Sequence, residues 1–392
     1  VGGGSSNTVT GNYNTSVGYN ALRKLSSGHY NLAIGHNALT EVNSSNYNLG
    51  IGYQAGMEIT TGTRNLAIGH NALDNADTES DNIAIGYDAL GAAVDGGEKN
   101  IAIGNYSGDA LTTADENVFL GYKAGTTTTT GYHNVAIGAY ALENADTGNN
   151  NVAIGYEAME CAANTNADDN VAIGKSALKA AADGTSGNVA IGVNALTVGT
   201  GDDNTAVGYN AANSITTGQR NVMLGTEAGH ALVDDNNNTI IGYQAGDNLT
   251  AGNGNVIIGC YTDAASTTAS GQLAIGTAEG INNPFYWIKG TNDGTITMNH
   301  RADVVAVSSN TTLTNAQTGS YVYWTAGTLT LPANSEVGTQ FTIFNNTGGS
   351  ATVGFSSGEA IVSGWASNAA VADHDATAYV CVATDSWVQV GA

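Results

Sequence analysis

A short motif that returns about every 17 residues constrains this chain more than any other feature of its sequence. The motif is Asn, a variable residue, a small residue, an aliphatic residue and Gly, as in Asn-Leu-Ala-Ile-Gly at 31–35. It occurs in 16 copies, whose glycines are Gly18, Gly35, Gly52, Gly69, Gly86, Gly104, Gly121, Gly138, Gly155, Gly174, Gly192, Gly208, Gly225, Gly242, Gly259 and Gly276. A single unit is too short to bury an apolar face, whereas stacked units bury a continuous core. The sequence therefore predicts an all-β fold, a β-solenoid of 16 repeats of about 17 residues.

The aliphatic position of the motif is Val, Ile or Leu in every copy, for example at Ile34, Ile68 and Ile137. β-Branched residues favour strands, and side chains alternate between the two faces of a strand. The aliphatic position therefore shares a face with the residue two before it, usually Leu or Val, and the small residue lies on the opposite face. We expect this thick apolar face to pack from repeat to repeat, so that an Asp at position 137 would bury an unpaired charge and prevent shaft assembly.

The Asn position is equally regular, with Asn31, Asn65 and Asn134 as examples and Gln272 in the last copy. Strands stacked about 4.8 Å apart place successive amides where each can bond the next. We therefore expect a structural amide ladder at a turn, with a binding role for this column as the alternative.

The invariant glycine of the motif, as at Gly35, Gly69 and Gly138, indicates a backbone bend or a close approach of two segments. The residue after it is often aromatic, beginning with Tyr19 and His36. A stripe of aromatic rings can bind sugar, but we expect these rings to stack on one another and to support neighbouring repeats.

The thin Ala/Gly face of the strand would remain exposed in an isolated coil. Three chains around one axis would cover that face and would also bury sheet edges. The sequence therefore predicts a homotrimer.

The charge of the chain excludes several partners. The formal net charge is −24, so the basic footprint of a nucleic-acid-binding protein is missing, and docking on anionic lipid is disfavoured. No apolar run is long enough to cross a bilayer, so we expect no membrane insertion. Cys161, Cys260 and Cys381 lie too far apart in sequence for a metal motif or a disulfide framework. The chain begins at Val1, and we expect an N-terminal portion to be missing from it.

The periodicity ends near residue 280, which divides the chain into a shaft at 1–280, a connector at 281–300 and a tip at 301–392. Short strand candidates separated by turn residues predict a small β-sandwich or jelly-roll-like tip. Three of the four tryptophans lie in this part, at Trp324, Trp365 and Trp387. Each is a candidate for the core or for a sugar-binding site, and Trp365, between Gly364 and Ala366, is the best candidate for exposure.

No local motif combines residues into a catalytic set, so we expect no enzyme activity. Three acidic clusters precede or adjoin an Asn position, at 168–170, 202–204 and 234–236. They could hold Ca²⁺ through oxygen ligands, although solvated turns are the simpler interpretation. His36 and His70, two repeats apart, could hold a metal on a three-fold axis, but we expect no cofactor.

The complete unit, Asn-x-Ala-Ile-Gly-Tyr-x-Ala-Leu, resembles the repeats of phage tail-fibre proteins. It is also similar to the head repeats of trimeric autotransporter adhesins, which share the segment Val-Ala-Ile-Gly found here at 135–138. Both resemblances imply a trimeric β-solenoid shaft. The chain shows no heptads or membrane anchor after residue 280, and the segment Pro284–Gly290 resembles one that follows such repeats in phage fibres, so the phage family is favoured.

The resemblance implies a structural fibre on the virion surface, outside the cell, that attaches to a host-surface glycan or protein through the tip. Other virion proteins would bind the missing N-terminal part. A bacterial trimeric surface adhesin is the alternative in the same class. A tailspike that cleaves polysaccharide, using paired carboxylates, is the alternative in another class.

Overall fold

A computed structural model describes residues 10–92, 96–161, 166–278, 284–290 and 296–298, and then 304–314, 321–326, 328–331, 339–345, 351–355, 360–361, 370–371, 376–383 and 386–390. The chain divides into two compact units, Val1–Met298 and Asn299–Ala392. Every regular element in the described residues is a strand. The two units are described separately below.

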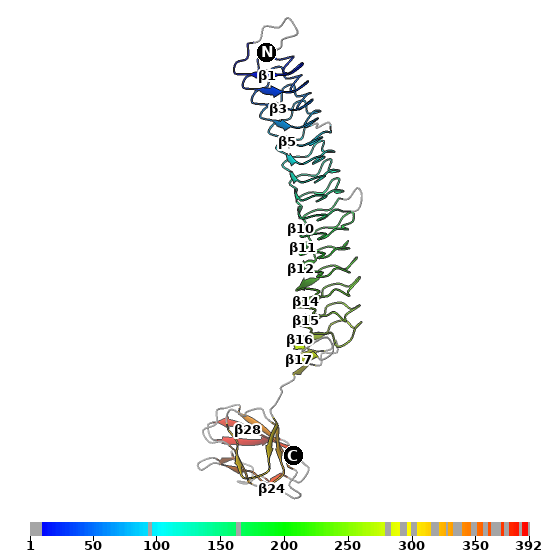
Figure 1. The fold of residues 1–392 in the computed structure, drawn as a ribbon. Helices are drawn as coiled ribbons and strands as arrows, with labels where there is room; N and C mark the ends of the chain where they lie inside the picture. The colour runs from blue at the N-terminus through cyan, green and yellow to red at the C-terminus, as the bar shows by residue number, and fades with distance from the viewer. Residues whose placement is uncertain are drawn as a thin grey trace. The chain divides into compact units, whose positions relative to one another are not determined.

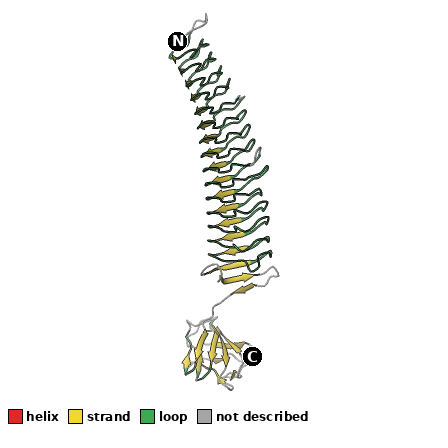
Figure 2. Ribbon diagram, turned by 45° about the vertical axis from the view of Figure 1, so that its right-hand side comes forward, coloured by secondary structure: helices red, strands yellow, loops and turns green. Residues whose placement is uncertain are grey.

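The first unit is a β-solenoid in which each repeat forms one coil with one short strand (Figures 1 and 2). The strands are β1 (Thr15–Val17), β2 (Leu32–Ile34), β3 (Leu49–Ile51), β4 (Leu66–Ile68), β5 (Ile83–Ile85), β6 (Ile101–Ile103), β7 (Val118–Leu120), β8 (Val135–Ile137), β9 (Val152–Ile154), β10 (Val171–Ile173), β11 (Val189–Ile191), β12 (Thr205–Val207), β13 (Val222–Leu224), β14 (Thr239–Ile241), β15 (Val256–Ile258) and β16 (Leu273–Ala278). Successive strands pair in parallel along the chain. The all-β solenoid predicted from the sequence is confirmed.

The register of the sheet follows the motif position by position. In the pair β8–β9, for example, Ile137 lies beside Ile154, and Ala136 beside Ala153. The same relation holds from β1 to β16, even where the connector between two strands is one or two residues longer or shorter. Length variation therefore falls in the connectors and leaves the sheet in register.

The side of the strand that faces the core is the opposite of the one expected. The small middle residue is buried, with Ala33 fully inaccessible, whereas Ile34 after it is 38% exposed. Almost every strand repeats this pattern, with an inaccessible middle residue between two partly exposed neighbours. The interior of a coil is narrow and also receives the side chains of the Ala-Leu pair, such as Ala38 and Leu39, which leaves little room for a large strand residue.

Three of the four bulky middle residues, Phe119, Met223 and Ile240, occur in coils where the Ala-Leu pair is replaced by Ala-Gly. Phe119 is buried in the coil that has Gly125 in the position of Leu, and a Cβ built on Gly125 would lie 2.7 Å from the ring. Met223 similarly lies opposite Gly229, with 2.7 Å between the sulfur and a Cβ built there. In these coils the strand supplies the large side chain in place of the residue that follows Ala, so the interior stays filled.

The invariant glycine stacks directly on the glycine of the next coil. Gly138 has a φ of +131°, and a Cβ built on it would lie 2.7 Å from the carbonyl carbon of Gly155. A side chain there would collide with a paired backbone, which is the close approach that the sequence suggested.

Each coil turns at residues in the left-handed region that are not glycine. In the second coil these are Tyr30, Asn37 and Leu39, with φ values of 58°, 59° and 49°. A single residue other than Gly in this conformation costs about 1–2 kcal/mol. Inter-coil backbone hydrogen bonds are made at these corners, such as the one from the Asn37 amide to the Tyr19 carbonyl, and they offset this cost.

The C-terminal end of the parallel sheet is closed by the chain itself. Strand β17 (Pro284–Gly290) pairs antiparallel with β16, and β18 (Ile296–Met298) pairs antiparallel with β17. The segment 281–300, interpreted from the sequence as a connector, therefore supplies two strands of the solenoid sheet. The aliphatic and aromatic residues of Pro284–Gly290 suit a strand, although they break the repeat.

The described residues of the second unit form three small sheets, of six, three and two strands. Its strands are β19 (Val304–Val307), β20 (Thr311–Thr312), β21 (Tyr321–Trp324), β22 (Leu329–Leu331), β23 (Gln340–Asn345), β24 (Ala351–Thr352), β25 (Gly354–Phe355), β26 (Ala360–Ile361), β27 (Ala370–Val371), β28 (Ala376–Ala383) and β29 (Ser386–Val390). The pairs β19–β21, β21–β23 and β20–β22 are parallel. The pairs β23–β28, β24–β27 and β28–β29 are antiparallel, so the pairing in this unit is mixed, and the small β-sandwich or jelly-roll-like tip stays a prediction.

Candidate functional site

The conserved amides of the motif form a hydrogen-bonded ladder inside the solenoid. The side-chain oxygen of Asn31 accepts from the backbone N–H of Asn48 at 2.9 Å, and that of Asn48 accepts from the N–H of Asn65 at 2.9 Å. From Asn14 to Asn221, the side-chain NH₂ donates to a connector carbonyl of the next coil, as from Asn134 to Gly148 at 2.7 Å. These asparagines are buried, so their polar groups satisfy the backbone of the corner and are not available to a ligand.

A second ladder, two residues before the first, uses two of the three acidic clusters that had suggested Ca²⁺. An oxygen of Asp168 accepts from the backbone N–H of Asn149 at 2.7 Å, and an oxygen of Asp202 accepts from the N–H of Ser186 at 2.9 Å. In the third cluster, Asp234 accepts from the hydroxyl of Thr216 and from that of Thr217, the latter at 3.1 Å, and these two hydrogen bonds lower the pKa of Asp234. Among the described residues, no group of three or more His, Cys, Asp or Glu side chains is placed to hold a metal ion.

The aromatic residues that follow the glycine in the first five copies stack along the outside of the solenoid. The rings of Tyr53 and His70 have centroids 4.8 Å apart and planes inclined by 21°. The stack continues through His36 on one side and Tyr87 on the other. Because stacked rings cover each other's faces, the ring faces that a sugar would stack on are occupied within this ladder. His36 and His70 are thereby separated by the Tyr53 ring, which lies between them.

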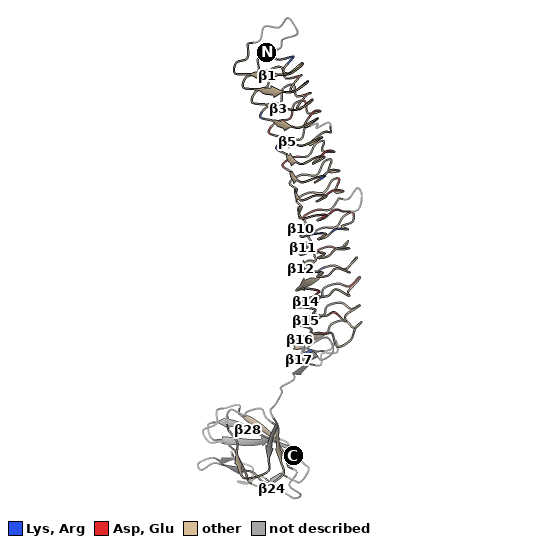
Figure 3. Cartoon of the chain, in the orientation of Figure 1, with Lys and Arg blue, Asp and Glu red and all other residues tan. Residues whose placement is uncertain are grey.

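Charged residues gather on the connectors and corners, whereas the strands carry none up to β16 (Figure 3). Some pair with the same position of the next coil, as Arg64 does with Asp81 and Lys99 with Glu116 at 3.0 Å. The guanidinium of Arg64 lowers the pKa of the Asp81 carboxyl through a hydrogen bond. Both pairs are exposed, so each contributes little to stability.

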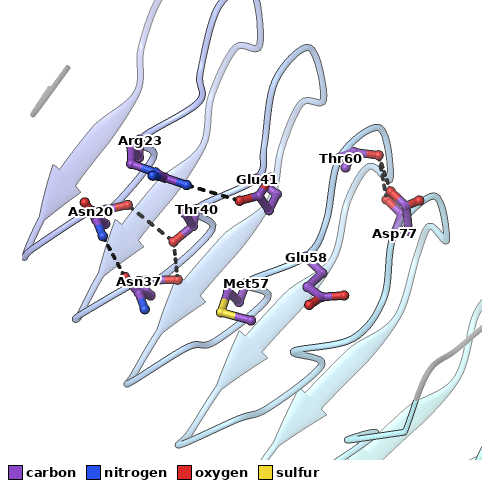
Figure 4. Close-up of a pocket in the computed structure, with 9 residues that line it drawn as sticks. All are labelled: Asn20, Arg23, Asn37, Thr40, Glu41, Met57, Glu58, Thr60 and Asp77. Atoms are coloured by element: carbon purple, nitrogen blue, oxygen red, sulfur yellow. Dashed lines mark hydrogen bonds and ion pairs between the residues drawn. The ribbon is translucent and has the colours of Figure 1, made fainter. Parts of the chain in front are cut away.

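An open groove of about 430 Å³ lies on the connector side of the first coils (Figure 4). Its charged groups are largely engaged with each other. Glu41 pairs with Arg23 at 3.5 Å and with Lys24, and Asp77 accepts a hydrogen bond from Thr60. The lining residues are Asn20, Arg23, Asn37, Thr40, Glu41, Met57, Glu58, Thr60 and Asp77.

Three carboxyl groups have raised pKa values: burial raises the pKa of Asp109, and the shifts of two others, Asp74 and Asp263, are larger. Burial raises the pKa of Asp74 to about 6, and the nearby carboxylates of Asp88 and Glu58 act in the same direction. At the other end of the solenoid, burial raises the pKa of Asp263 to about 7, with a further contribution from a hydrogen bond to Asp247 in the preceding coil.

These two groups should make the solenoid less stable as the pH rises from about 4 to 7. In that range the folded chain holds a proton on Asp263 that the unfolded chain, with an ordinary pKa of 3.8, has lost, so unfolding becomes easier with rising pH. We expect the melting temperature of the last coils to fall between pH 5 and pH 8, and the variant Asp263→Asn to lose part of this dependence. Hydrogen exchange in the segment 246–264, followed at both pH values, measures this change in the stability of the last coils. An identical pH dependence in wild type and variant would contradict the assignment.

The tryptophans proposed for receptor binding have different outcomes. Trp324 is 1% exposed and lies in the core of the second unit, so its ring cannot stack on a receptor in this conformation. Trp387 belongs to β29, where the backbone is placed but the side chain is outside the described part, and Trp365 lies wholly outside the described residues.

An aromatic pair that the sequence analysis did not single out lies on the opposite side of the same sheet. Tyr323, next to the buried Trp324, is 41% exposed. Its ring lies 5.6 Å from that of Phe344, its register partner on β23, with planes inclined by 7°. The alternation of buried and exposed residues along β21 is the signal that could have found it.

Comparison with known proteins adds no relative. No protein family, no curated protein and no solved structure matches this chain. Within the described parts, no helix has the length and apolar character needed to cross a membrane. The function is therefore argued from the surfaces of the chain itself.

Proposed function

We propose that this chain is the shaft and tip of a fibre that projects from a virion and attaches to a receptor on the host surface, a glycan or a protein. The observation that carries the proposal is the unbroken register of β1 to β16. At about 4.8 Å per strand, fifteen steps give a shaft of about 70 Å. Such a stack spans distance with one repeated unit, which is what a structural fibre requires.

The resemblance of the repeat to phage tail-fibre proteins supports a place on the virion surface. A bacterial adhesin would use the same shaft and is the alternative within this class. The amides of the first ladder are buried and hydrogen-bonded within the solenoid, and the rings of the aromatic ladder cover one another's faces. Both ladders therefore support a structural role for the shaft.

The tip is the better candidate for receptor contact. In the described part of the tip, Tyr323 and Phe344 form an outward pair of aromatic rings, and amphipathic aromatic side chains are enriched at recognition surfaces. The homotrimer expected from the sequence is kept as part of the proposal, with several copies of the tip held together by one shaft.

Competition for adsorption tests this function. The purified chain should reduce adsorption of the parent particle to host cells, and Tyr323→Ala should weaken this competition at least tenfold, because the outward ring pair is lost. The matched control is Tyr243→Ala, which removes an exposed tyrosine of the shaft and should compete like wild type.

Three results would contradict the proposal in different ways. Absence of any competition by the wild-type chain would contradict the attachment role. Loss of competition in the shaft variant alone would move the receptor site from the tip to the solenoid. Release of reducing ends from host polysaccharide by the purified chain would favour the tailspike alternative.

A further inference from the structure

The tyrosines of the fifth to ninth coils are arranged differently from the stacked rings of the first coils. They stand alternately one and two residues after the motif glycine, at Tyr87, Tyr106, Tyr122, Tyr140 and Tyr156, and we call this row the tyrosine zigzag. Neighbouring rings meet edge to face, with centroids 5.3–6.2 Å apart and planes inclined by 66–86°. Because the rings do not stack face to face, they leave ring surface free for other groups.

Charged residues beside the zigzag pair between coils in a fixed way. In the seventh coil the residue two after the glycine is Lys123, and its ammonium lies 3.5 Å from Glu143, which is five residues after the next glycine. In the ninth coil the same two positions carry Glu157 and Lys179, with 2.6 Å between carboxylate and ammonium. At both places the solenoid itself therefore supplies an ammonium group to a carboxylate.

The position of Lys123 shows which ligand the rings accept. Its Nζ atom lies 5.9 Å from the ring centroid of Tyr122 and 5.9 Å from that of Tyr140. At this distance the ring quadrupole attracts a cation. An ammonium group between a carboxylate and two edge-to-face tyrosines is thus an arrangement that this surface already contains once.

The fifth coil has the same rings but lacks the cation. The equivalent charged positions are Asp88 and Asp109, two carboxylates, and the adjacent rings are Tyr87 and Tyr106. The charge of Asp88 raises the pKa of the Tyr87 hydroxyl, and burial, together with the charge of Asp88, raises the pKa of Asp109. None of the ion pairs formed by the described residues includes either carboxylate.

The preceding coil adds two acceptors to this place. Asp74 occupies the position of Asp109 one repeat earlier than the fifth coil, and the Asp88 charge contributes to its raised pKa. Asn71 occupies the position of Asp88 in that coil, and its buried Oδ1 atom has no hydrogen-bond partner among the described residues. A cation with N–H donors would relieve both the repulsion between the carboxylates and the unsatisfied acceptor. Since no group of acidic or metal-binding side chains in the described chain is placed to hold a metal ion, an organic cation fits better.

We propose that the fifth coil binds the alkylammonium group of another molecule between Asp88 and Asp109, beside the rings of Tyr87 and Tyr106. A lysine side chain of a protein and an amino sugar of a glycan both carry this group. The site belongs to the solenoid unit, and the inference does not depend on the proposed attachment through the tip.

Titration calorimetry with the full chain tests the site. The probes are Nα-acetyl-lysine amide and glucosamine, and the controls are the same molecules acetylated on the ammonium nitrogen. Both amines should bind, the acetylated forms should not, and Asp88→Asn should weaken binding about fivefold. The matched control Glu116→Gln, which removes an exposed carboxylate already paired with Lys99, should bind like the wild type.

The stronger of the two amine probes identifies the source of the ammonium group, and either order supports the site. Absence of binding by both amines, or equal binding of the acetylated forms, would overturn the proposal. Displacement of the bound amine by equimolar Ca²⁺ would also overturn it, because the carboxylates would then form a metal site.

The variant Asp88→Lys provides an independent measurement. It places an ammonium group of the chain itself beside Asp109, as Lys123 is placed beside Glu143 in the seventh coil. This variant should lose amine binding and gain protection from hydrogen exchange in the segment 86–109, because a pair of like charges becomes a pair of opposite charges. Amine binding equal to that of the wild type, or lower protection than in the wild type, would overturn the proposal.

Discussion

Replacing Gly138 by alanine is expected to open the solenoid at its eighth coil, at a cost of about 4 kcal/mol or more. The residue has a φ of +131°, which alanine rarely adopts, and the new Cβ would lie 2.7 Å from the carbonyl carbon of Gly155 and closer still to its oxygen. Relief by backbone movement is blocked, because the amide of Gly138 donates to Leu120 and the carbonyl of Gly138 is packed on the same stack.

Gly184 provides the matched control for this substitution. It also has a positive φ, +80°, but a Cβ built on it meets nothing within 4 Å. Gly184→Ala should therefore cost only about 1–2 kcal/mol for the left-handed conformation. Because repeat arrays need not unfold in one step, hydrogen exchange around residues 118–155 is the appropriate measurement. Equal protection in the two variants would show that the glycine stack is not sterically closed.

Phe119→Ala is expected to destabilise the solenoid by about 3–5 kcal/mol, and Gly125→Leu is expected to rescue it. The ring is fully buried, and its removal leaves a cavity beside Gly125. The double variant would give this coil the pair found in the next one, where Ala136 lies with Leu142 and both are inaccessible. Leucine is compatible with the backbone there, since Leu142 has a φ of 54° and Gly125 one of +60°.

A double-mutant cycle measures this compensation. Gly125→Leu alone should also be destabilising, because its side chain would overlap the Phe119 ring. The double variant should be more stable than either single variant in chemical denaturation. Additive losses in the double variant would show that the two positions do not share one volume.

The repeat predicted the fold and the register, but not which face of the strand lies inside. Alternation along a segment such as Val135–Ile137 assigns the outer two residues to one face, and both faces are apolar, so hydrophobicity alone cannot tell them apart. The direction in which the chain turns at Gly138 decides it, and that is a three-dimensional property. The combination of a large Phe119 with a small Gly125 contained the missing information. Two positions whose side-chain volumes compensate each other must lie in the same interior.

Other parts of the molecule depended on contacts that a single sequence does not display. The strand Pro284–Gly290 joins the sheet by antiparallel pairing, although its composition does not indicate which strand it pairs with. The left-handed corners at Tyr30 and Leu39 are occupied by residues with no preference for that conformation, so their geometry is imposed by stacking between coils. Stacking of the aromatic residues, in contrast, followed directly from their spacing and is seen at Tyr53 and His70.

The trimeric shaft is the central claim of the proposed function, and an electron cryo-microscopy map of the purified full chain tests it most directly. We expect a rod with an axial repeat of about 4.8 Å, in which three copies run parallel and the outer strand residues, such as Ile137, lie next to the common axis. A rod made of one copy, with Ile137 and its column in contact with solvent, would contradict the claim.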